Sequence, residues 1–101
     1  MIHMEYKSFS WEETAYPGIE VFEVENKANR LRYFKIDKGS KIPMHSHNGN
    51  EKIVLLSGEM EFSGKKLIIG DLLSTEKGEK HEAFALKDSL IFILNERIST
   101  I

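Results

Sequence analysis

Residues 39–58 decide the fold, and they read GSKIPMHSHNGNEKIVLLSG. Two histidines, His45 and His47, stand one residue apart, and Glu51 follows four positions after the second. Side chains at positions i and i+2 of a strand lie on the same face, so the two imidazoles can converge on one ion. The turn-forming residues 48–50 predict a chain reversal that lets Glu51 project toward the same point. The pattern is typical of a metal site, but also of a polar turn between two strands.

The rest of the chain predicts an all-β protein. Short stretches of strand-forming residues are repeatedly followed by glycine, and apolar residues do not recur at the three- and four-residue spacing of a helix. Closely spaced strands with tight turns at Ser57-Gly58 and Ser63-Gly64 favour a sandwich, jelly roll or small barrel. The expected strands are Glu20–Val24, Leu31–Asp37, Lys41–His45, Lys52–Leu56, Glu59–Phe62, Lys66–Ile69, Leu72–Ser74, His81–Leu86 and Leu90–Asn95.

Length and composition restrict the class of protein. A chain of 101 residues predicts a single domain, and 41% hydrophobic with 30% charged residues is typical of a soluble globular protein. The longest apolar run, Leu90–Leu94, is too short to span a bilayer, and the N-terminus has neither a basic leader nor an apolar segment. The chain has no cysteine, so nitrogen and oxygen must hold any metal. We expect a cytoplasmic protein without a membrane role.

Charge and strand pattern indicate partners. A net charge of −2 gives no basic surface for nucleic acid. The runs Ile53–Leu56 and Leu90–Leu94 do not alternate with polar residues, which predicts strands buried on both faces. Residues 1–18, rich in aromatic side chains, should cover one such face by packing on the barrel or on a partner subunit. A small barrel cannot cover the rest, so we expect a homodimer.

The spacing of glycines around the histidines resembles the cupin superfamily, in particular small RmlC-like jelly rolls. Its first motif, G(X)5HXH(X)3-4E(X)6G, is matched throughout residues 39–58. Its second motif, G(X)5PXG(X)2H(X)3N, is matched over residues 70–85 with His81 at the histidine position. Two positions depart from this pattern, because Glu76 replaces the proline and Ala85 replaces the asparagine. The resemblance implies a double-stranded β-helix, a jelly-roll barrel, with His45, His47, Glu51 and His81 as metal ligands.

Three imidazoles and one carboxylate suit a divalent transition metal, which could be Fe, Mn, Ni, Co, Cu or Zn. They suit calcium poorly, because calcium prefers oxygen ligands. Four protein ligands on an octahedral ion would leave two positions for water, a substrate or dioxygen, which is the open arrangement of catalytic sites. A purely structural ion would instead have every position filled by protein.

The walls of the expected pocket follow from strand parity. If His81 faces inward, Ala83 and Ala85 do so too, and the small side chain of Ala85 should leave space beside the metal. Other expected lining residues are apolar: Ile53, Leu55, Met60, Phe62 and Phe92. These residues are equally typical of a plain barrel core.

Arg32 and Tyr33 lie on opposite faces of one expected strand, so one of them alone can point inside, where either is a candidate to orient a substrate. A solvent-exposed arginine and a core tyrosine are their default roles, and the remaining histidine, His3, is expected to be exposed. The scarcity of inward polar groups favours a protein that binds or senses a small ligand. The alternative is a metal-dependent dioxygenase, isomerase or lyase acting on a small oxygen-bearing organic molecule, and fold alone does not decide between them.

Overall fold

The structure, a computed structural model, describes residues 1–24, 29–46 and 49–96. Within these residues the chain forms one short 3-10 helix and ten strands. They are η1 (Tyr6–Ser8), β1 (Glu12–Glu13), β2 (Ile19–Val24), β3 (Asn29–Ile36), β4 (Lys41–Ser46), β5 (Glu51–Ser57), β6 (Met60–Phe62), β7 (Lys65–Leu67), β8 (Leu72–Thr75), β9 (Lys80–Ala85) and β10 (Ser89–Glu96).

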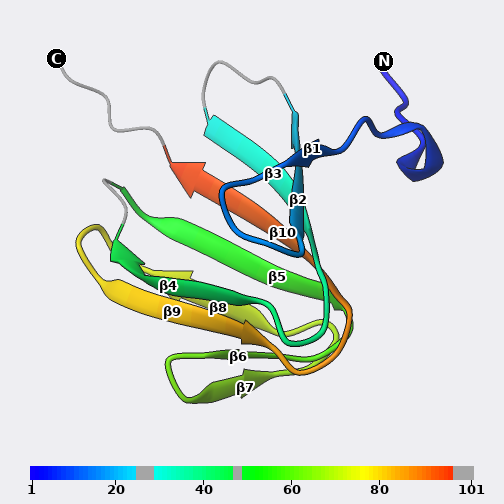
Figure 1. The fold of residues 1–101 in the computed structure, drawn as a ribbon. Helices are drawn as coiled ribbons and strands as arrows, with labels where there is room; N and C mark the ends of the chain where they lie inside the picture. Colours follow the sequence, from blue (N-terminus) through cyan, green and yellow to red (C-terminus); the bar gives the residue numbers. More distant parts are fainter. Residues whose placement is uncertain (25–28, 47–48, 97–101) are drawn as a thin grey trace, which may run out of the picture.

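The strands form two antiparallel sheets that face each other as a jelly roll (Figure 1). One sheet has six strands in the order β1-β2-β3-β10-β5-β8, and the other has four in the order β4-β9-β6-β7. The all-β jelly-roll prediction is confirmed. Each of the nine expected strands is present with ends within two residues of the prediction, whereas the short β1 and η1 were not predicted.

The core lies between the two sheets and follows the alternation of each strand. On β5 the side chains of Ile53 and Leu55 are buried while their neighbours face outward, and β9 alternates in the same way. Glycine is required at the turn before β6, where Gly58 has a φ of +87°. A Cβ atom there would lie 2.3 Å from the carbonyl oxygen of Asp88, so no other residue fits without a shift of the backbone.

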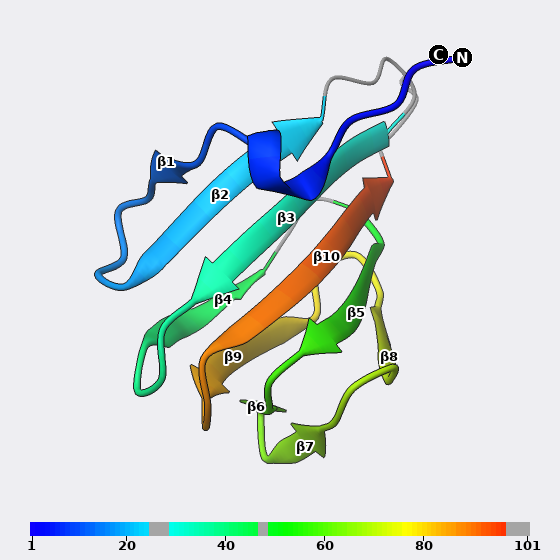
Figure 2. The same ribbon diagram turned by 90° about the vertical axis from the view of Figure 1, so that its right-hand side faces the viewer.

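The N-terminal segment lies against the outer face of the six-stranded sheet. Figure 2 shows η1 in front of β2 and β3. The ring of Phe9 stacks on Phe22 with centroids 4.2 Å apart and lies 5.1 Å from the ring of Tyr33. The ammonium of Lys35 lies 4.4 Å from the centre of the Trp11 ring, which adds a cation–π contact. This segment therefore covers the outer face of β2 and β3.

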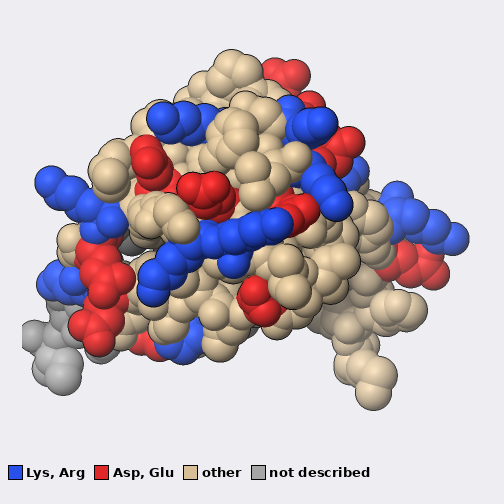
Figure 3. Space-filling view, turned by 90° about the horizontal axis from the view of Figure 1, so that it is seen from below, with Lys and Arg blue, Asp and Glu red and all other residues tan. Residues whose placement is uncertain are grey.

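Charged side chains of both signs are mixed on the surface. On the face seen from below in Figure 1, Lys and Arg side chains are interspersed with Asp and Glu (Figure 3). That face therefore carries no single-sign patch of the kind that binds nucleic acid. Among the described residues, no helix has the length and apolar character needed to cross a membrane. The cytoplasmic location stays a prediction of the sequence.

Candidate metal centre and cavity

Three of the four expected metal ligands lie near one another in pairs between the two sheets. His45 on β4 and His81 on β9 are direct cross-strand partners, and their ring centroids are 4.5 Å apart. Glu51 is the first residue of β5 in the opposite sheet. Its Oε1 lies 3.5 Å from Nε2 of His81. The fourth expected ligand, His47, lies outside the described residues.

Burial distinguishes these side chains from a polar surface turn. Glu51 is 1% exposed and His81 is 6% exposed, while His45 is half-buried. Burying a carboxylate without compensation costs several kcal/mol, so it needs charge or hydrogen-bond partners close by. The nearby imidazole of His81 and the amide of Asn95 are two such partners for Glu51.

The backbone settles which nitrogen of His45 can bind a metal. Nδ1 of His45 lies 2.8 Å from the carbonyl oxygen of Pro43. A carbonyl oxygen only accepts hydrogen bonds, so in the neutral ring Nδ1 carries the proton. The lone pair is then on Nε2, and this nitrogen is the one available to a metal ion.

A hydrogen-bonded chain behind Glu51 orients its carboxylate. Nδ2 of Asn95 donates to Oε2 of Glu51 at 2.8 Å, and Nη2 of Arg32 donates to Oδ1 of Asn95 at 2.5 Å. The carboxylate only accepts and the guanidinium only donates, so the two partners together specify how the Asn95 amide is turned. Asn95 was not among the residues predicted from the sequence to lie at the site. Its inward orientation could have been predicted, because Asn95 follows Ile91 and Ile93 at the two-residue spacing of side chains that share one face of a strand.

The structure corrects the default roles of Arg32 and Tyr33. Arg32 pairs across the sheet with the buried Ile93, so it faces inward and is half-buried rather than solvent-exposed. Tyr33 pairs with Phe92, so both lie on the outer face, where their ring centroids are 5.0 Å apart. The outer aromatic side chains need the cover of the N-terminal segment, and this selects the register that turns Arg32 inward. Burial lowers the pKa of Arg32, and the nearby charge of Arg30 lowers it further.

A cavity of about 770 Å³ opens between the sheets beside these residues. This volume lies within the usual range of small-molecule sites. The walls combine the candidate ligands with apolar and charged side chains: Ser10, Glu12, Glu13, Thr14, Tyr16, Ile19, Val21, Phe22, Glu23, Arg30, Arg32, Phe34, Ile42, His45, Glu51, Ile53, Phe62, His81, Ala83, Ile91 and Ile93. The expected scarcity of inward polar groups is therefore wrong, because β1, β2 and β3 carry several.

Four expected lining residues lie elsewhere. Ala85 faces inward with no exposed surface, but it pairs with the buried Met60 and is not part of the cavity wall. Ala85 lies four residue steps along the strand from His81, which is about 13 Å at ~3.3 Å per residue. Its small side chain therefore leaves no space beside the candidate ligands. Leu55 is also core, and Phe92 is on the outer face.

The described residues do not by themselves form a complete metal site. Across residues 1–24, 29–46 and 49–96, no three His, Cys, Asp or Glu side chains are arranged so that they could hold a metal ion. The structure brings His45, Glu51 and His81 near one another in pairs, and the assignment of an ion to them depends on His47. The remaining histidine, His3, is exposed as expected.

A family model named the ChrR cupin-like domain matches residues 1–99. The chain belongs to this family. The resemblance to cupins seen in the two sequence motifs is therefore confirmed. No curated protein matches the sequence.

Several solved structures share the fold of this chain. A structure titled as Rhodobacter sphaeroides SigE in complex with the anti-sigma ChrR matches with a TM-score of 0.83 at 18% identity, covering 91% of this chain and 52% of that one. The domain thus spans about half the length of that neighbour. An RmlC-like cupin from Shewanella frigidimarina matches with a TM-score of 0.84 at 17% identity, covering 94% and 89%. An acetylacetone dioxygenase from Acinetobacter johnsonii matches with a TM-score of 0.80 at 17% identity, covering 95% of this chain and 72% of that one.

This chain keeps the turn of the second motif although Glu76 replaces the proline. The amide of Glu79 donates to the carbonyl oxygen of Glu76 at 3.0 Å. Gly78, inside this turn, has a φ of +85°, a backbone conformation that glycine adopts without strain. The glycine and the hydrogen bond therefore close the turn that precedes His81.

Proposed function

We propose that this chain binds one divalent transition metal through His45, His47, Glu51 and His81, and uses the site to bind or sense a small ligand in the adjacent cavity. The observation that carries the proposal is the position of the buried Glu51 carboxylate, 3.5 Å from His81, whose ring packs against that of His45. A deprotonated carboxylate beside two imidazoles is a typical transition-metal environment. The spacing of the first motif supports His47 as the fourth ligand.

The donor set fits a metal of intermediate softness, which could be Fe, Mn, Ni, Co, Cu or Zn. When bound, such an ion would act as a Lewis acid and could accept an oxygen atom of a ligand at a position not filled by protein. The protein contributes the orientation of its donors. Pro43 selects Nε2 of His45 for the metal, and Asn95 holds the Glu51 carboxylate in place.

Elemental analysis tests the metal proposal directly. We expect about one divalent metal per chain in protein purified without added metal, and a large loss of metal in His45→Ala and His81→Ala, since each removes one of only four donors. His3→Ala is the matched control, because it removes an exposed histidine outside both motifs and should keep the metal. Full metal content in His81→Ala would show that the site is misassigned.

The open coordination position has its own test. Cobalt(II) replaces many divalent metals and its visible spectrum depends on its ligands. If four protein side chains leave a position open, azide should change the spectrum of the cobalt-substituted protein. An unchanged spectrum would indicate a closed, structural ion.

The alternative function is a metal-dependent enzyme, a dioxygenase, isomerase or lyase, acting on a small oxygen-bearing organic molecule. The charged wall of the cavity favours it, because Arg32 could orient a substrate. The structural similarity to a protein titled acetylacetone dioxygenase is consistent with this chemistry. Dioxygen uptake by the metal-loaded protein against a panel of small acids, diketones and phenols separates the two functions. Uptake that depends on the added compound supports the enzyme.

We also propose that the chain forms a homodimer through the outer face of β10, β5 and β8. The N-terminal segment lies over β2 and β3, whereas the outward side chains of β5 and β8 include Leu56 and Leu72, which are 40% and 60% exposed. Leu72 lies opposite Val54 in the sheet, so these apolar residues share one face. Twofold association would bury this face.

A further inference from the structure

We propose that the cavity binds a small organic monocarboxylate with an apolar body, and that the guanidinium of Arg32 binds its carboxylate. The inference deepens the proposed function, since it uses the same cavity, and it names the chemical class of the ligand. It begins from the position of Arg32 on the inner face of β3, where Ile93 is its cross-strand neighbour and its guanidinium lies 5.0 Å from the centre of the Phe34 ring.

Arg32 is charged and partly desolvated, and its guanidinium forms no direct ion pair with any acidic side chain that the structure describes. Its hydrogen bond goes to the neutral Asn95, and among the described residues no carboxylate lies within 4 Å of its guanidinium. Its Nε is buried and makes no hydrogen bond within that part of the chain. Removing a charge from water is costly unless a counter-charge compensates it. An anion in the cavity would supply that compensation.

The nearest acidic side chains are committed to other groups. Glu23, the cross-strand neighbour of Arg32 on β2, forms an ion pair with Arg30. Glu51 accepts a hydrogen bond from Asn95 and faces His81. Glu51 and Glu23 therefore favour the charged form of Arg32 only from a distance, and neither forms a direct ion pair with its guanidinium.

The rest of the cavity indicates what else the ligand carries. A planar guanidinium matches the two oxygens of a carboxylate, so two parallel hydrogen bonds can form. The wall formed by Ile42, Phe62 and Ala83 is apolar and suits a hydrocarbon body. Glu12 and Glu13 line the cavity and are exposed, and their charges would repel a dianion more than a monoanion. Benzoate and hexanoate have this combination of one carboxylate and an apolar body.

A second role for Arg32 has to be separated from this one, because Arg32 also holds the Asn95 amide that orients Glu51. A residue with that positioning role alone would change metal affinity but would not distinguish a carboxylate from a neutral ligand of the same shape. Benzamide is the neutral counterpart of benzoate and provides this comparison.

Calorimetric titration of benzoate, hexanoate and benzamide tests the inference, on protein as purified and after removal of metal with a chelator. We expect wild-type protein to bind at least one of the carboxylates, with benzoate at least about tenfold tighter than benzamide and Arg32→Met weakening carboxylate binding by about tenfold or more. The matched control is the double variant Glu5→Gln, Lys7→Gln, which removes an exposed ion pair outside the cavity without changing net charge. It should bind within about threefold of wild type.

The outcomes separate this inference from the metal proposal, because metal content is measured on the same samples. Stoichiometric metal with no carboxylate binding, or with binding unchanged in Arg32→Met, would overturn the ligand inference and leave the metal proposal standing. Arg32-dependent binding in protein that holds no metal would do the reverse. If Arg32→Met does not fold, Arg32→Lys replaces it, since a lysine keeps the charge but loses the planar fork. Equal affinity for benzoate and benzamide in wild type would also overturn the inference.

Discussion

At the residue scale, Asn95 orients the carboxylate of Glu51, one of the four proposed metal ligands. Its amide accepts from Arg32 and donates to Glu51, so it holds the Glu51 carboxylate in a single orientation. Loss of such a partner typically lowers metal affinity by about 10–100-fold. We therefore expect Asn95→Ala to lower metal affinity by about this factor, measured by competition with a coloured chelator.

Leu94→Ala is the control for this prediction, because Leu94 is next to Asn95 but faces the other side of β10. It should lower stability through lost packing and leave metal affinity unchanged. Equal affinities of wild type and Asn95→Ala would contradict the role given to the amide.

Gly58 allows a second prediction at the same scale. A Cβ atom at this position would lie 2.3 Å from backbone and side-chain oxygens of Asp88 and Ser89, in addition to the strain of a positive φ. Gly64 has a φ of +84° but open space around it. Gly58→Ala should therefore lower the free energy of unfolding by at least about 1 kcal/mol more than Gly64→Ala, measured by urea denaturation. Equal losses would show that the backbone yields easily at this turn.

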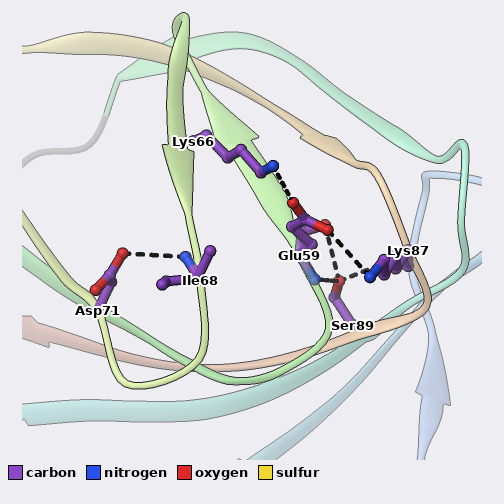
Figure 4. Close-up of polar contacts among 6 residues, drawn as sticks. All are labelled: Glu59, Lys66, Ile68, Asp71, Lys87 and Ser89. Atoms are coloured by element: carbon purple, nitrogen blue, oxygen red, sulfur yellow. Dashed lines mark hydrogen bonds and ion pairs between the residues drawn. The ribbon is translucent and has the colours of Figure 1, made fainter.

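At the scale of elements, Glu59 joins three segments of the chain. It precedes β6, and its carboxylate contacts Lys66 on β7 and Lys87 in the connection between β9 and β10 (Figure 4). The hydroxyl of Ser89 on β10 accepts a hydrogen bond from the amide of Glu59 at 3.1 Å. The hydrogen bond from Lys66, followed by that from Lys87, holds the pKa of Glu59 below its ordinary value.

The lowered pKa of Glu59 predicts a pH dependence of stability. A carboxylate with a lower pKa in the folded than in the unfolded protein stabilises the fold above its unfolded pKa, and this contribution is lost as pH falls through the folded value. Glu59→Gln should therefore lower the melting temperature at pH 7, and the difference from wild type should disappear as pH falls below about 4. The effect should be small and weaken in high salt, because Lys66 and Lys87, the two cations that pair with Glu59, are exposed.

Glu61→Gln is the control for Glu59→Gln, since it removes a carboxylate from the same hairpin. The melting temperature should differ less between this variant and wild type at pH 7. A difference between wild type and Glu59→Gln that grows on acidification would contradict the ion pairs.

At the scale of the whole molecule, the outer face of the six-stranded sheet has one region covered by the N-terminal segment and another that is apolar and exposed. Light scattering at micromolar concentration should give about twice the chain mass of 11.6 kDa. Leu72→Lys together with Leu56→Lys should give the monomer, because two charges would have to be buried in the interface. Phe84→Lys, on β9 of the other sheet, should leave the dimer intact. A monomeric wild type would contradict the proposed dimer.

The jelly-roll fold could be predicted from the amino-acid sequence alone. Period-two alternation, positive-φ glycines and the spacing of two motifs were local signals, and each of the nine expected strands followed from them. The same motifs named His45, Glu51 and His81, which β4, β9 and β5 bring together. His47 stays a prediction of the sequence, as does the metal.

The tertiary structure decided which faces those strands present. Alternation assigns Arg32 and Tyr33 to opposite faces of their strand but does not say which face is the inner one. The inner face is set by the cross-strand register with Ile93 and Phe92, and by the aromatic side chains that cover the outer face. The tertiary structure also places Asn95 beside Glu51, a contact between residues 44 positions apart in the sequence. Strand alternation predicted correctly that Ala85 faces inward, but Ala85 lies in the core and not in the cavity wall. The position of the cavity along the barrel depends on how the six-stranded and four-stranded sheets pack together, which alternation does not determine.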